Sequence, residues 1–239
     1  MKYLTTPWIW MITFSVMIVH DLLYLLLRWF SKKPYLLCCR LWHILLKIIF
    51  PLTGVRVTIK GRDHIPQTGA YIIASTHQSM LDIPLMLLSV PPGFAFYAKR
   101  GLTKIPVIGW NLKGMDSFLI NRKNPRQALK DLAKSKKKVI EGRPLLIFPE
   151  GTRSSDGRVA SFKRGAFSIA VQTGTPVIPC LISGAYDVVR KGQFWVRPGK
   201  VTITFGQAIS VEKVSKDKEK EASVAVMTAT KNTINQLLK

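Results

Sequence analysis

The chain has 239 residues, of which 47% are hydrophobic, so it can form one substantial core and a short additional element. Lysine and arginine total 36 against 13 aspartates and glutamates, and the resulting net charge of +23 attracts polyanions such as nucleic acid or an anionic bilayer. The 3 cysteines, with Cys38 beside Cys39 and Cys180 distant, exclude a disulfide framework and a cysteine metal site, and they favour a reducing, cytoplasmic setting.

The first apolar segment runs from Trp8 to Leu27. Its length of about 20 residues suits a helix that crosses a hydrocarbon core, but His20 and Asp21 interrupt it, so spanning and insertion into one leaflet both stay open. A signal peptide fits poorly, because Lys2 is the only early charge and no small-residue cleavage pattern follows. A soluble nucleic-acid binder does not need such a run, so a membrane surface is the better partner.

A second apolar helix is predicted for residues 35–50, after a break at Pro34. Arg40, His43 and Lys47 lie three and four residues apart on one face, and leucine, isoleucine and tryptophan occupy the other. Such a helix can lie in the interfacial plane with its cations near lipid phosphates. The alternative is that both apolar segments are ordinary core helices, but their length and tryptophan content favour membrane contact.

Together the two segments predict a membrane-associated helical hairpin at residues 1–50, followed by an α/β domain at residues 51–239. The first segment is preceded by a single lysine and followed by Arg28 and by lysines at 32–33. Positive charge of this kind stays on the cytoplasmic side of a membrane. We therefore expect the domain to lie in the cytosol, at the cell inner membrane or the cytoplasmic face of the cell membrane.

The remainder of the chain alternates short apolar runs with helix-like or loop segments, which is an α/β rhythm. Helices are predicted at 126–140 and at 212–238. The predicted strands are 55–59, 70–74, 94–98, 117–120, 145–148, 177–182 and 201–205.

Polar clusters directly follow four of these strands, beginning at His77, Lys99, Asn121 and Glu150. In an open α/β sheet, ligands bind outside the carboxyl ends of parallel strands. If these strands are mutually parallel, the four clusters converge on one crevice.

The first cluster places His77 five residues before Asp82. This spacing works if His77 lies in a loop and Asp82 in the first turn of the next helix, so that the carboxylate reaches back to the imidazole. Such a pair fixes the imidazole tautomer and performs general-base chemistry. Alone, the spacing fits a structural histidine hydrogen-bonded to a nearby carboxylate better than it fits a catalytic base. Ser79 lies in no nucleophile-elbow motif, and we interpret it as a cap or structural hydroxyl.

The second cluster is Phe-Pro-Glu-Gly-Thr-Arg-Ser at residues 148–154. An apolar strand ends here in a turn that holds Glu150, Gly151 and Arg153. The planar fork of arginine suits a phosphomonoester, and glycine lets backbone N–H groups approach a ligand closely. A solvated turn with a Glu150–Arg153 ion pair is an equally good interpretation of this motif alone.

In combination, these motifs resemble the glycerolipid acyltransferases, specifically the bacterial-type 1-acylglycerol-3-phosphate acyltransferases. The resemblance rests on His-x-x-x-x-Asp at residues 77–82 and on the 148–154 run. It extends through Gly-Met-Asp-Ser-Phe-Leu-Ile-Asn-Arg at 114–122, Phe-Lys-Arg-Gly at 162–165 and Val-Ile-Pro at 177–179. Together the motifs cover residues 54–205 in the family's order. Thr76 departs from the pattern, because the family usually has asparagine there.

The resemblance implies a mixed, largely parallel sheet flanked by helices, and it implies that His77 is the catalytic base oriented by Asp82. It further implies that phosphate and acceptor contacts come from strand-following residues. Lys163 is a weaker candidate, since a solvated role fits it at least as well. The implied substrate-binding residues are Glu150, Gly151, Thr152, Arg153, Arg122 and Lys99.

The implied reaction moves a fatty acyl group from an acyl thioester to the sn-2 hydroxyl of 1-acyl-glycerol-3-phosphate (lysophosphatidate) and yields phosphatidate. A thioester is already activated, so one positioned base can suffice without an acyl-enzyme, a metal or a cofactor. The expected co-substrate is acyl carrier protein or coenzyme A carrying the acyl chain. The expected partners are therefore these substrates and the bilayer, and not nucleic acid.

Three rival functions remain. Within the same enzyme class, the acceptor is glycerol-3-phosphate or another lysophospholipid; the apolar hairpin favours the lipid acceptor. A basic membrane-binding module without catalysis explains the charge and the hairpin but not the ordered motifs. A nucleic-acid binder is the weakest reading, because the sequence lacks interleaved aromatics and a helix-turn-helix pattern.

Overall fold

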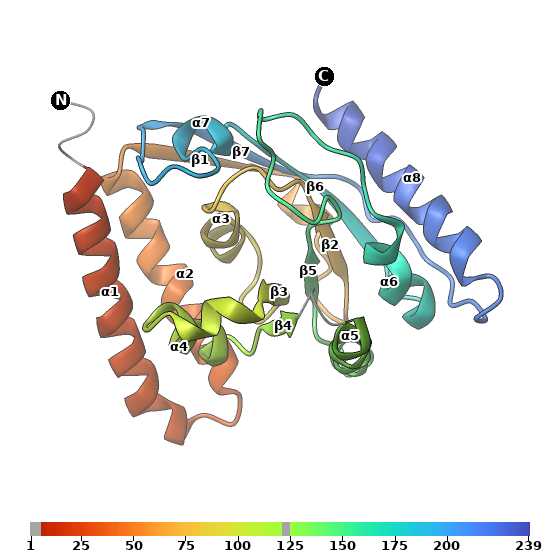
Figure 1. Ribbon diagram of the computed structural model, residues 1–239, viewed down its shortest axis with the longest axis horizontal. Coiled ribbons are helices and arrows are strands. Elements are labelled where there is room, and N and C mark those ends of the chain that lie inside the picture. Colours follow the sequence, from red (N-terminus) through yellow and green to blue (C-terminus); the bar gives the residue numbers. More distant parts are fainter. Residues whose placement is uncertain (1–5, 121–124) are drawn as a thin grey trace.

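The computed structural model describes residues 6–120 and 125–239, with a sheet of 7 strands at its centre (Figure 1). The strand order is β1-β7-β6-β2-β5-β3-β4. The strands are β1 Val55–Lys60, β2 Ile72–Ser75, β3 Ala95–Lys99, β4 Phe118–Ile120, β5 Leu145–Ile147, β6 Val177–Ser183 and β7 Gly199–Phe205. The α-helices are α1 Thr6–Leu27, α2 Pro34–Leu52, α3 Asp82–Ser89, α4 Ile108–Gly114, α5 Pro125–Ile140, α6 Ser168–Thr173, α7 Ala185–Val188 and α8 Glu219–Leu237.

The sheet is mixed and largely parallel, as predicted. β2 pairs in parallel with β5 and β6, and β3 pairs in parallel with β5 and β4. β1 is parallel to β7, whereas β6 and β7 are antiparallel. The strands β2, β5, β3 and β4 therefore end at the same edge of the sheet. This arrangement is the one in which the polar clusters that follow them can converge.

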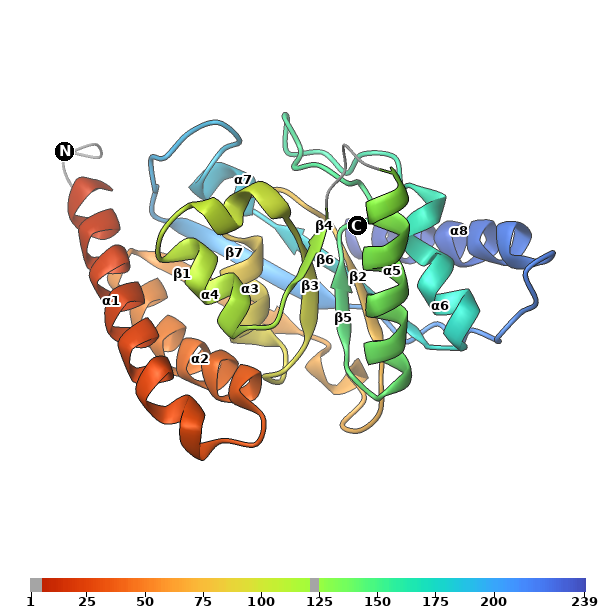
Figure 2. The ribbon, with the colours of Figure 1, turned by 60° about the horizontal axis from the view of Figure 1, so that its bottom comes forward.

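Helices cover both faces of the sheet and create two hydrophobic cores (Figures 1 and 2). Ile73 and Leu146 belong to the core under α2 and α3, and their neighbours Ile72 and Leu145 belong to the core under α6 and α8. Successive side chains of a strand point to opposite faces, so each of these strands contributes to both cores. This double coverage explains why β2, β5 and most of β6 are continuous buried apolar runs.

The carboxyl-terminal helix begins later than predicted. α8 starts at Glu219, whereas the charge pattern placed its start at residue 212. The backbone N–H of Val214 donates to the carbonyl of Val171 at 3.0 Å, and Val211 and Val214 pack against the second core. These contacts with α6 hold the preceding segment outside the helix.

α1 and α2 form the predicted hairpin, and they lie side by side along one flank of the molecule (Figures 1 and 2). Both are long and apolar enough to cross a membrane by length and composition. Large apolar side chains of α1 are exposed from Trp8 to Leu26, and the turn after α1 adds Trp29 and Phe30, which are 78% and 84% exposed. This extended apolar surface indicates membrane association.

The inner face of α2 packs against the domain, which corrects the predicted arrangement of this helix. Trp42 is buried, and His43 Nδ1 lies 2.9 Å from the carbonyl oxygen of Leu87. Arg40 and Lys47 are exposed. The tryptophan therefore faces the protein and not lipid, and His43 turns inward from the predicted polar face.

The two polar residues that interrupt the apolar pattern of α1 also face the domain. Asp21 Oδ1 accepts a hydrogen bond from Asn111 Nδ2 at 2.8 Å, and Asn111 Oδ1 accepts one from Trp42 Nε1 at 2.5 Å. His20 Nε2 lies 3.2 Å from the carbonyl oxygen of Cys38. All five side chains are buried. This network joins α1, α2 and α4, which explains why an apolar helix tolerates a histidine and an aspartate.

We expect Asn111→Ala to lower the free energy of unfolding by about 2 kcal/mol, because it removes the donor to the buried Asp21 carboxylate and the acceptor of the Trp42 indole. Urea unfolding in a detergent that preserves the fold measures this change. Asn235→Ala, at an exposed position of α8, is the matched control. Equal stabilities of the two variants would show that the network does not dock the hairpin.

Candidate active site

The candidate site forms where β2 and β5 end beside each other. The register pairs Ile72 with Leu145 and Ala74 with Ile147. His77 and Glu150 each lie three residues beyond the last pair, so the parallel register brings them opposite each other. The backbone N–H of His77 donates to Glu150 Oε1 at 2.8 Å. The two strongest sequence motifs therefore meet at one place.

The expected contact between His77 and Asp82 is present. His77 Nδ1 lies 2.7 Å from Asp82 Oδ2, and Asp82 occupies the first turn of α3. The same oxygen accepts the backbone N–H groups of Gln78 and Ser79 at 2.7 and 2.9 Å. A carboxylate only accepts hydrogen bonds, so Nδ1 carries the imidazole proton and Nε2 is the basic nitrogen. The side chain of Asp82 is fully buried, whereas that of His77 is 21% exposed and can be reached from solvent.

Ser79 has a structural role in this loop, in agreement with its interpretation from sequence. Its side chain is buried, and Ser79 Oγ donates to the carbonyl of Val189 at 2.8 Å. The Gln78 side-chain amide donates to the carbonyl of Gly157 at 2.9 Å. Thr76, at which the sequence departs from the family pattern, also has a hydrogen-bonded side chain: its Oγ1 accepts the backbone N–H of Ile182 at 2.9 Å. These bonds fix the loop that carries His77 to neighbouring segments.

Phe148 and Glu150, which follow β5, hold His77 through its ring and its backbone. The ring of Phe148 stacks on His77, with centroids 4.0 Å apart and an interplanar angle of 17°. Glu150 is buried, and its second oxygen accepts the backbone N–H of Ala160 at 3.0 Å. The backbone N–H of Ser154 donates to the carbonyl of His77 at 2.8 Å. The 150–154 turn is thereby bonded directly to the histidine loop.

Burial raises the pKa of the Glu150 carboxyl, against the lowering effect of its two backbone donors. Because the folded protein then holds this proton more tightly than the unfolded chain, Glu150 stabilises the fold most below the ordinary glutamate pKa. That contribution is lost as the pH rises through the raised value. We therefore expect the stability of wild type relative to Glu150→Gln to fall as the pH rises above about 4.

Urea unfolding at several pH values measures this difference. Glutamine leaves one backbone N–H without its acceptor, which gives an offset that does not depend on pH, so only the change with pH is diagnostic. Glu212→Gln, at an exposed position, is the control. Curves for wild type and Glu150→Gln that stay parallel across the pH range would contradict the raised pKa.

Gly151 and the lysines beside it give the turn its shape and charge. Gly151 has a φ of +75°, and a Cβ atom there would lie 3.0 Å from Lys163 Nζ. The Lys163 side chain thus lies across the glycine, although the sequence left this residue as a weak candidate. Lys191 Nζ donates to the carbonyl of Arg153 at 2.9 Å and to Thr152 Oγ1 at 3.3 Å. Sequence reasoning missed Lys191, because it lies 38 residues beyond Arg153 in a segment without a motif.

Of the two other predicted phosphate ligands, one lies within the described residues and one does not. Lys99 is exposed at the end of β3, the strand next to β5. The residue after it, Arg100, donates to the Asp131 carboxylate at 3.2 Å and is thereby held toward α5. Arg122, together with Asn121 of the third cluster, lies outside the described residues and stays a prediction.

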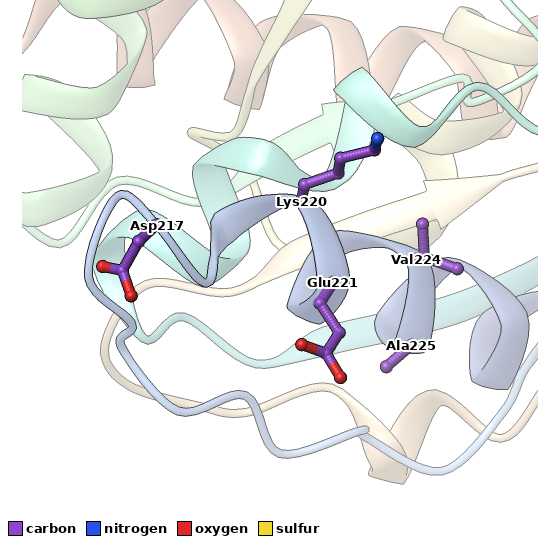
Figure 3. A pocket seen from close by; sticks show the side chains of 5 residues that line it. All are labelled: Asp217, Lys220, Glu221, Val224 and Ala225. Carbon is purple, nitrogen blue, oxygen red and sulfur yellow. The ribbon is translucent and has the colours of Figure 1, made fainter.

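A separate surface hollow lies on α8, far from these loops. Its lining comes from the start of the helix and the residues before it (Figure 3). It contains none of the predicted site residues: Asp217, Lys220, Glu221, Val224 and Ala225 line it.

Comparison with known proteins agrees with the motifs. A model of the family described as acyltransferase matches residues 56–183. The chain is 38% identical over 160 residues to a 1-acyl-sn-glycerol-3-phosphate acyltransferase of Chlamydomonas reinhardtii, covering 66% of this chain and 48% of that protein. It is 34% identical over 178 residues to a chloroplastic 1-acyl-sn-glycerol-3-phosphate acyltransferase of Arabidopsis thaliana, covering 74% and 49%. The chain thus spans about half the length of these curated relatives.

A solved structure matches nearly the whole chain. It is the crystal structure of the 1-acyl-sn-glycerophosphate acyltransferase PlsC from Thermotoga maritima, with a TM-score of 0.82 and 28% sequence identity. The match covers 99% of this chain and 97% of that one. The likeness therefore includes the hairpin as well as the sheet.

Proposed function

The chain belongs to the acyltransferase family, and from this premise we propose that it transfers a fatty acyl group from an acyl thioester to the sn-2 hydroxyl of 1-acyl-glycerol-3-phosphate. The product is phosphatidate. The observation that carries the proposal is the 2.7 Å contact between His77 and a fully buried Asp82, bonded through the backbone to the 150–154 turn. A base thus stands beside a loop whose glycine and arginine suit a phosphomonoester.

In the proposed reaction, His77 Nε2 takes the proton of the sn-2 hydroxyl as the oxygen attacks the thioester carbonyl. The tetrahedral intermediate then collapses, the carbon–sulfur bond breaks, and the imidazolium returns the proton to the departing thiolate. The Asp82 carboxylate stabilises the imidazolium through Nδ1 and holds the ring in one tautomer. Stacking on Phe148 fixes the plane of the ring, so that Nε2 is aimed before substrate binds.

Direct transfer is favoured because Ser79 and Cys180, two nucleophilic side chains near His77, are not available to attack a substrate. The Ser79 hydroxyl is buried and donates to the Val189 carbonyl, so it is not directed at a substrate. The Cys180 thiol is buried, and burial holds its pKa far above the usual value, so it stays protonated. We therefore propose a single displacement without an acyl-enzyme. The thioester is supplied by an acyl carrier protein or by coenzyme A.

We assign acceptor binding to the cations around the 150–154 turn. Arg153 offers a bidentate contact for the phosphate, and Lys99, Lys163 and Lys191 add positive charge from three other segments. Glu150 also positions the histidine loop, because its buried carboxylate accepts the backbone N–H groups of His77 and Ala160. Its contact with the acceptor, which the resemblance implied, stays a prediction.

The hairpin presents the site to lipid. The domain contacts it at both ends, through Trp10 Nε1 with the Phe194 carbonyl at 2.6 Å and through Arg143, whose guanidinium lies 4.2 Å from the Tyr35 ring centroid. Asn111 contacts its middle. A hairpin docked along its whole length brings the domain with it, so we propose that it lies in one leaflet. The basic chain then sits at the cytosolic face of the cell membrane, where it attracts anionic lipids.

A screen of substrates tests this function. Purified full-length protein is given acyl carrier protein or coenzyme A carrying the same labelled acyl chain, with lysophosphatidate, glycerol-3-phosphate or lysophosphatidylethanolamine as acceptor. We expect lysophosphatidate to give the highest kcat/KM with at least one donor. Faster acylation of either other acceptor would overturn the proposed acceptor, and no acylation of any of them would overturn the proposed function.

A further inference from the structure

The loop from Arg190 to Arg197 carries two adjacent aromatic residues that are exposed at its tip. Phe194 is 67% exposed and Trp195 is 43% exposed. The loop is nevertheless well fixed: the backbone N–H of Arg197 donates to the Val188 carbonyl at 2.9 Å, and Val196 is buried. A fixed loop that exposes large aromatic side chains presents a ready-made contact surface.

This aromatic tip is continuous with the apolar surface of the hairpin. Trp10 of α1 donates through Nε1 to the Phe194 carbonyl at 2.6 Å, and the rings of Trp10 and Phe194 meet edge to face with centroids 6.4 Å apart. Phe14, one turn further along α1, is 42% exposed, and its ring centroid lies 6.2 Å from that of Trp10. The surface of α1 therefore extends onto the domain at this point.

The charge of the 190–197 loop suits an anionic bilayer. Arg190 and Lys191 lie exposed within it, and no acidic residue occurs between Asp187 and Glu212. Aromatic side chains with adjacent cations are the pattern of membrane-interface anchors, because the rings enter the headgroup region while the cations meet lipid phosphates.

The other end of the loop contacts the candidate site. Lys191 Nζ bonds to the Arg153 carbonyl and to Thr152 Oγ1, and the carbonyl of Val189 accepts the hydroxyl of Ser79. One short loop thus connects the hairpin to both the 150–154 turn and the histidine loop. If the tip enters a bilayer, the depth of insertion determines how far these two loops lie from the lipid phosphates.

We propose that Phe194 and Trp195 form a second membrane anchor, which belongs to the domain itself and sets the acceptor site at the level of the lipid headgroups. The consequence for the acceptor rests on the proposed function, whereas membrane contact by the tip does not. An acyl carrier protein is the competing occupant, since it is an anionic macromolecule.

A fluorescent label at the tip tests the contact without any turnover. Cys38, Cys39 and Cys180 are buried, so an environment-sensitive dye on full-length Trp195→Cys reports that position. Val224→Cys, on the exposed side of α8 across the sheet from α1, is the matched control (Figure 1). With vesicles of phosphatidylcholine and phosphatidylglycerol, we expect a blue shift and quenching by nitroxide lipids at 195 and neither at 224.

Two outcomes overturn the proposal. One is a label at 195 that stays as exposed to water as the label at 224. The other is a response at 195 to acyl carrier protein without vesicles and none to vesicles, which makes the tip a protein-docking surface. Because this measurement needs no substrate, its failure is distinguishable from failure of the acyl-transfer function.

Kinetics then test the link to the acceptor. For Phe194→Ser combined with Trp195→Ser, we expect KM for lysophosphatidate in vesicles to rise about tenfold or more, because the burial of two aromatic side chains is lost. KM and kcat for a short-chain, water-soluble lysophosphatidate should stay at the wild-type values, as both should in Val224→Ser. An equal loss with both acceptors would assign the tip a structural role and overturn the link.

Discussion

Replacing His77 by alanine is expected to lower kcat by about 10²- to 10⁴-fold, the range that a positioned general base contributes. The variant keeps the 150–154 turn, so lysophosphatidate still binds and KM should change little. The sn-2 hydroxyl then loses its proton acceptor, and the departing thiolate loses its proton donor. Steady-state rates with vesicle-bound acceptor and a labelled acyl thioester measure the effect.

His64→Ala is the matched control for this experiment. His64 Nδ1 lies 2.9 Å from the carbonyl oxygen of Phe205, on a turn outside the candidate site, and we expect wild-type kcat from the variant. If His77→Ala retained more than about a tenth of the wild-type kcat, general-base catalysis by this residue would be excluded.

Asp82→Asn is expected to lower kcat by about two or more orders of magnitude with little change in KM. The substitution preserves size, but it removes the charge that stabilises the imidazolium. The amide oxygen can still receive the three donors that now converge on Asp82 Oδ2. The amide nitrogen then takes the place of Oδ1, which is buried without a hydrogen-bond partner in the described part of the chain. The buried amide N–H groups then lack an acceptor, so a folded but less stable protein with a slow chemical step is the expected phenotype.

Single-turnover kinetics separate this role from a purely structural one. Without the Asp82 charge to stabilise the imidazolium, we expect the rate of the chemical step to fall by the same factor as kcat, while the binding of lysophosphatidate changes little. Asp63→Asn, whose side chain is 84% exposed, serves as the control. A chemical step that keeps the wild-type rate while stability drops would show that Asp82 supports the loop without assisting His77.

The sequence predicted which segments meet at the candidate site, because the parallel strands do most of the positioning. An apolar run before His77 and another before Glu150 predicted two strand ends, and parallel pairing of β2 with β5 brings those ends together. The five-residue spacing to Asp82 predicted a contact that the structure contains. The strand ends and the spacing are local patterns that can be read along the chain. The parallel pairing was an assumption that only the structure bears out.

Contacts between distant segments were beyond the reach of those patterns. Lys191 reaches Thr152 and Arg153 across a loop that no periodicity marks. The occupation of Glu150 by two backbone donors depends on how two turns cross, and the sequence shows only a carboxylate next to a glycine. For the same reason, the composition of α1 could not show that Asp21 faces α4.

The start of α8 illustrates a further limit. Charge and helix propensity extend upstream of Glu219, but tertiary contacts of Val211 and Val214 keep that segment outside the helix. Propensity is a weak determinant where a segment can bury apolar side chains in another conformation.

The central claim is that the protein acylates lysophosphatidate by direct transfer, with His77 as the general base. One measurement tests this claim most directly. Wild-type protein and His77→Ala are incubated with vesicles that contain sn-1-acylated lysophosphatidate and with an acyl thioester labelled in its acyl chain. Products are then separated, and the position of the label is determined. The account predicts phosphatidate labelled at sn-2 from wild type and about 10²-fold less of it, or lower still, from the variant in the same time. Equal phosphatidate from both proteins, or thioester hydrolysis to free acid without phosphatidate, would contradict it.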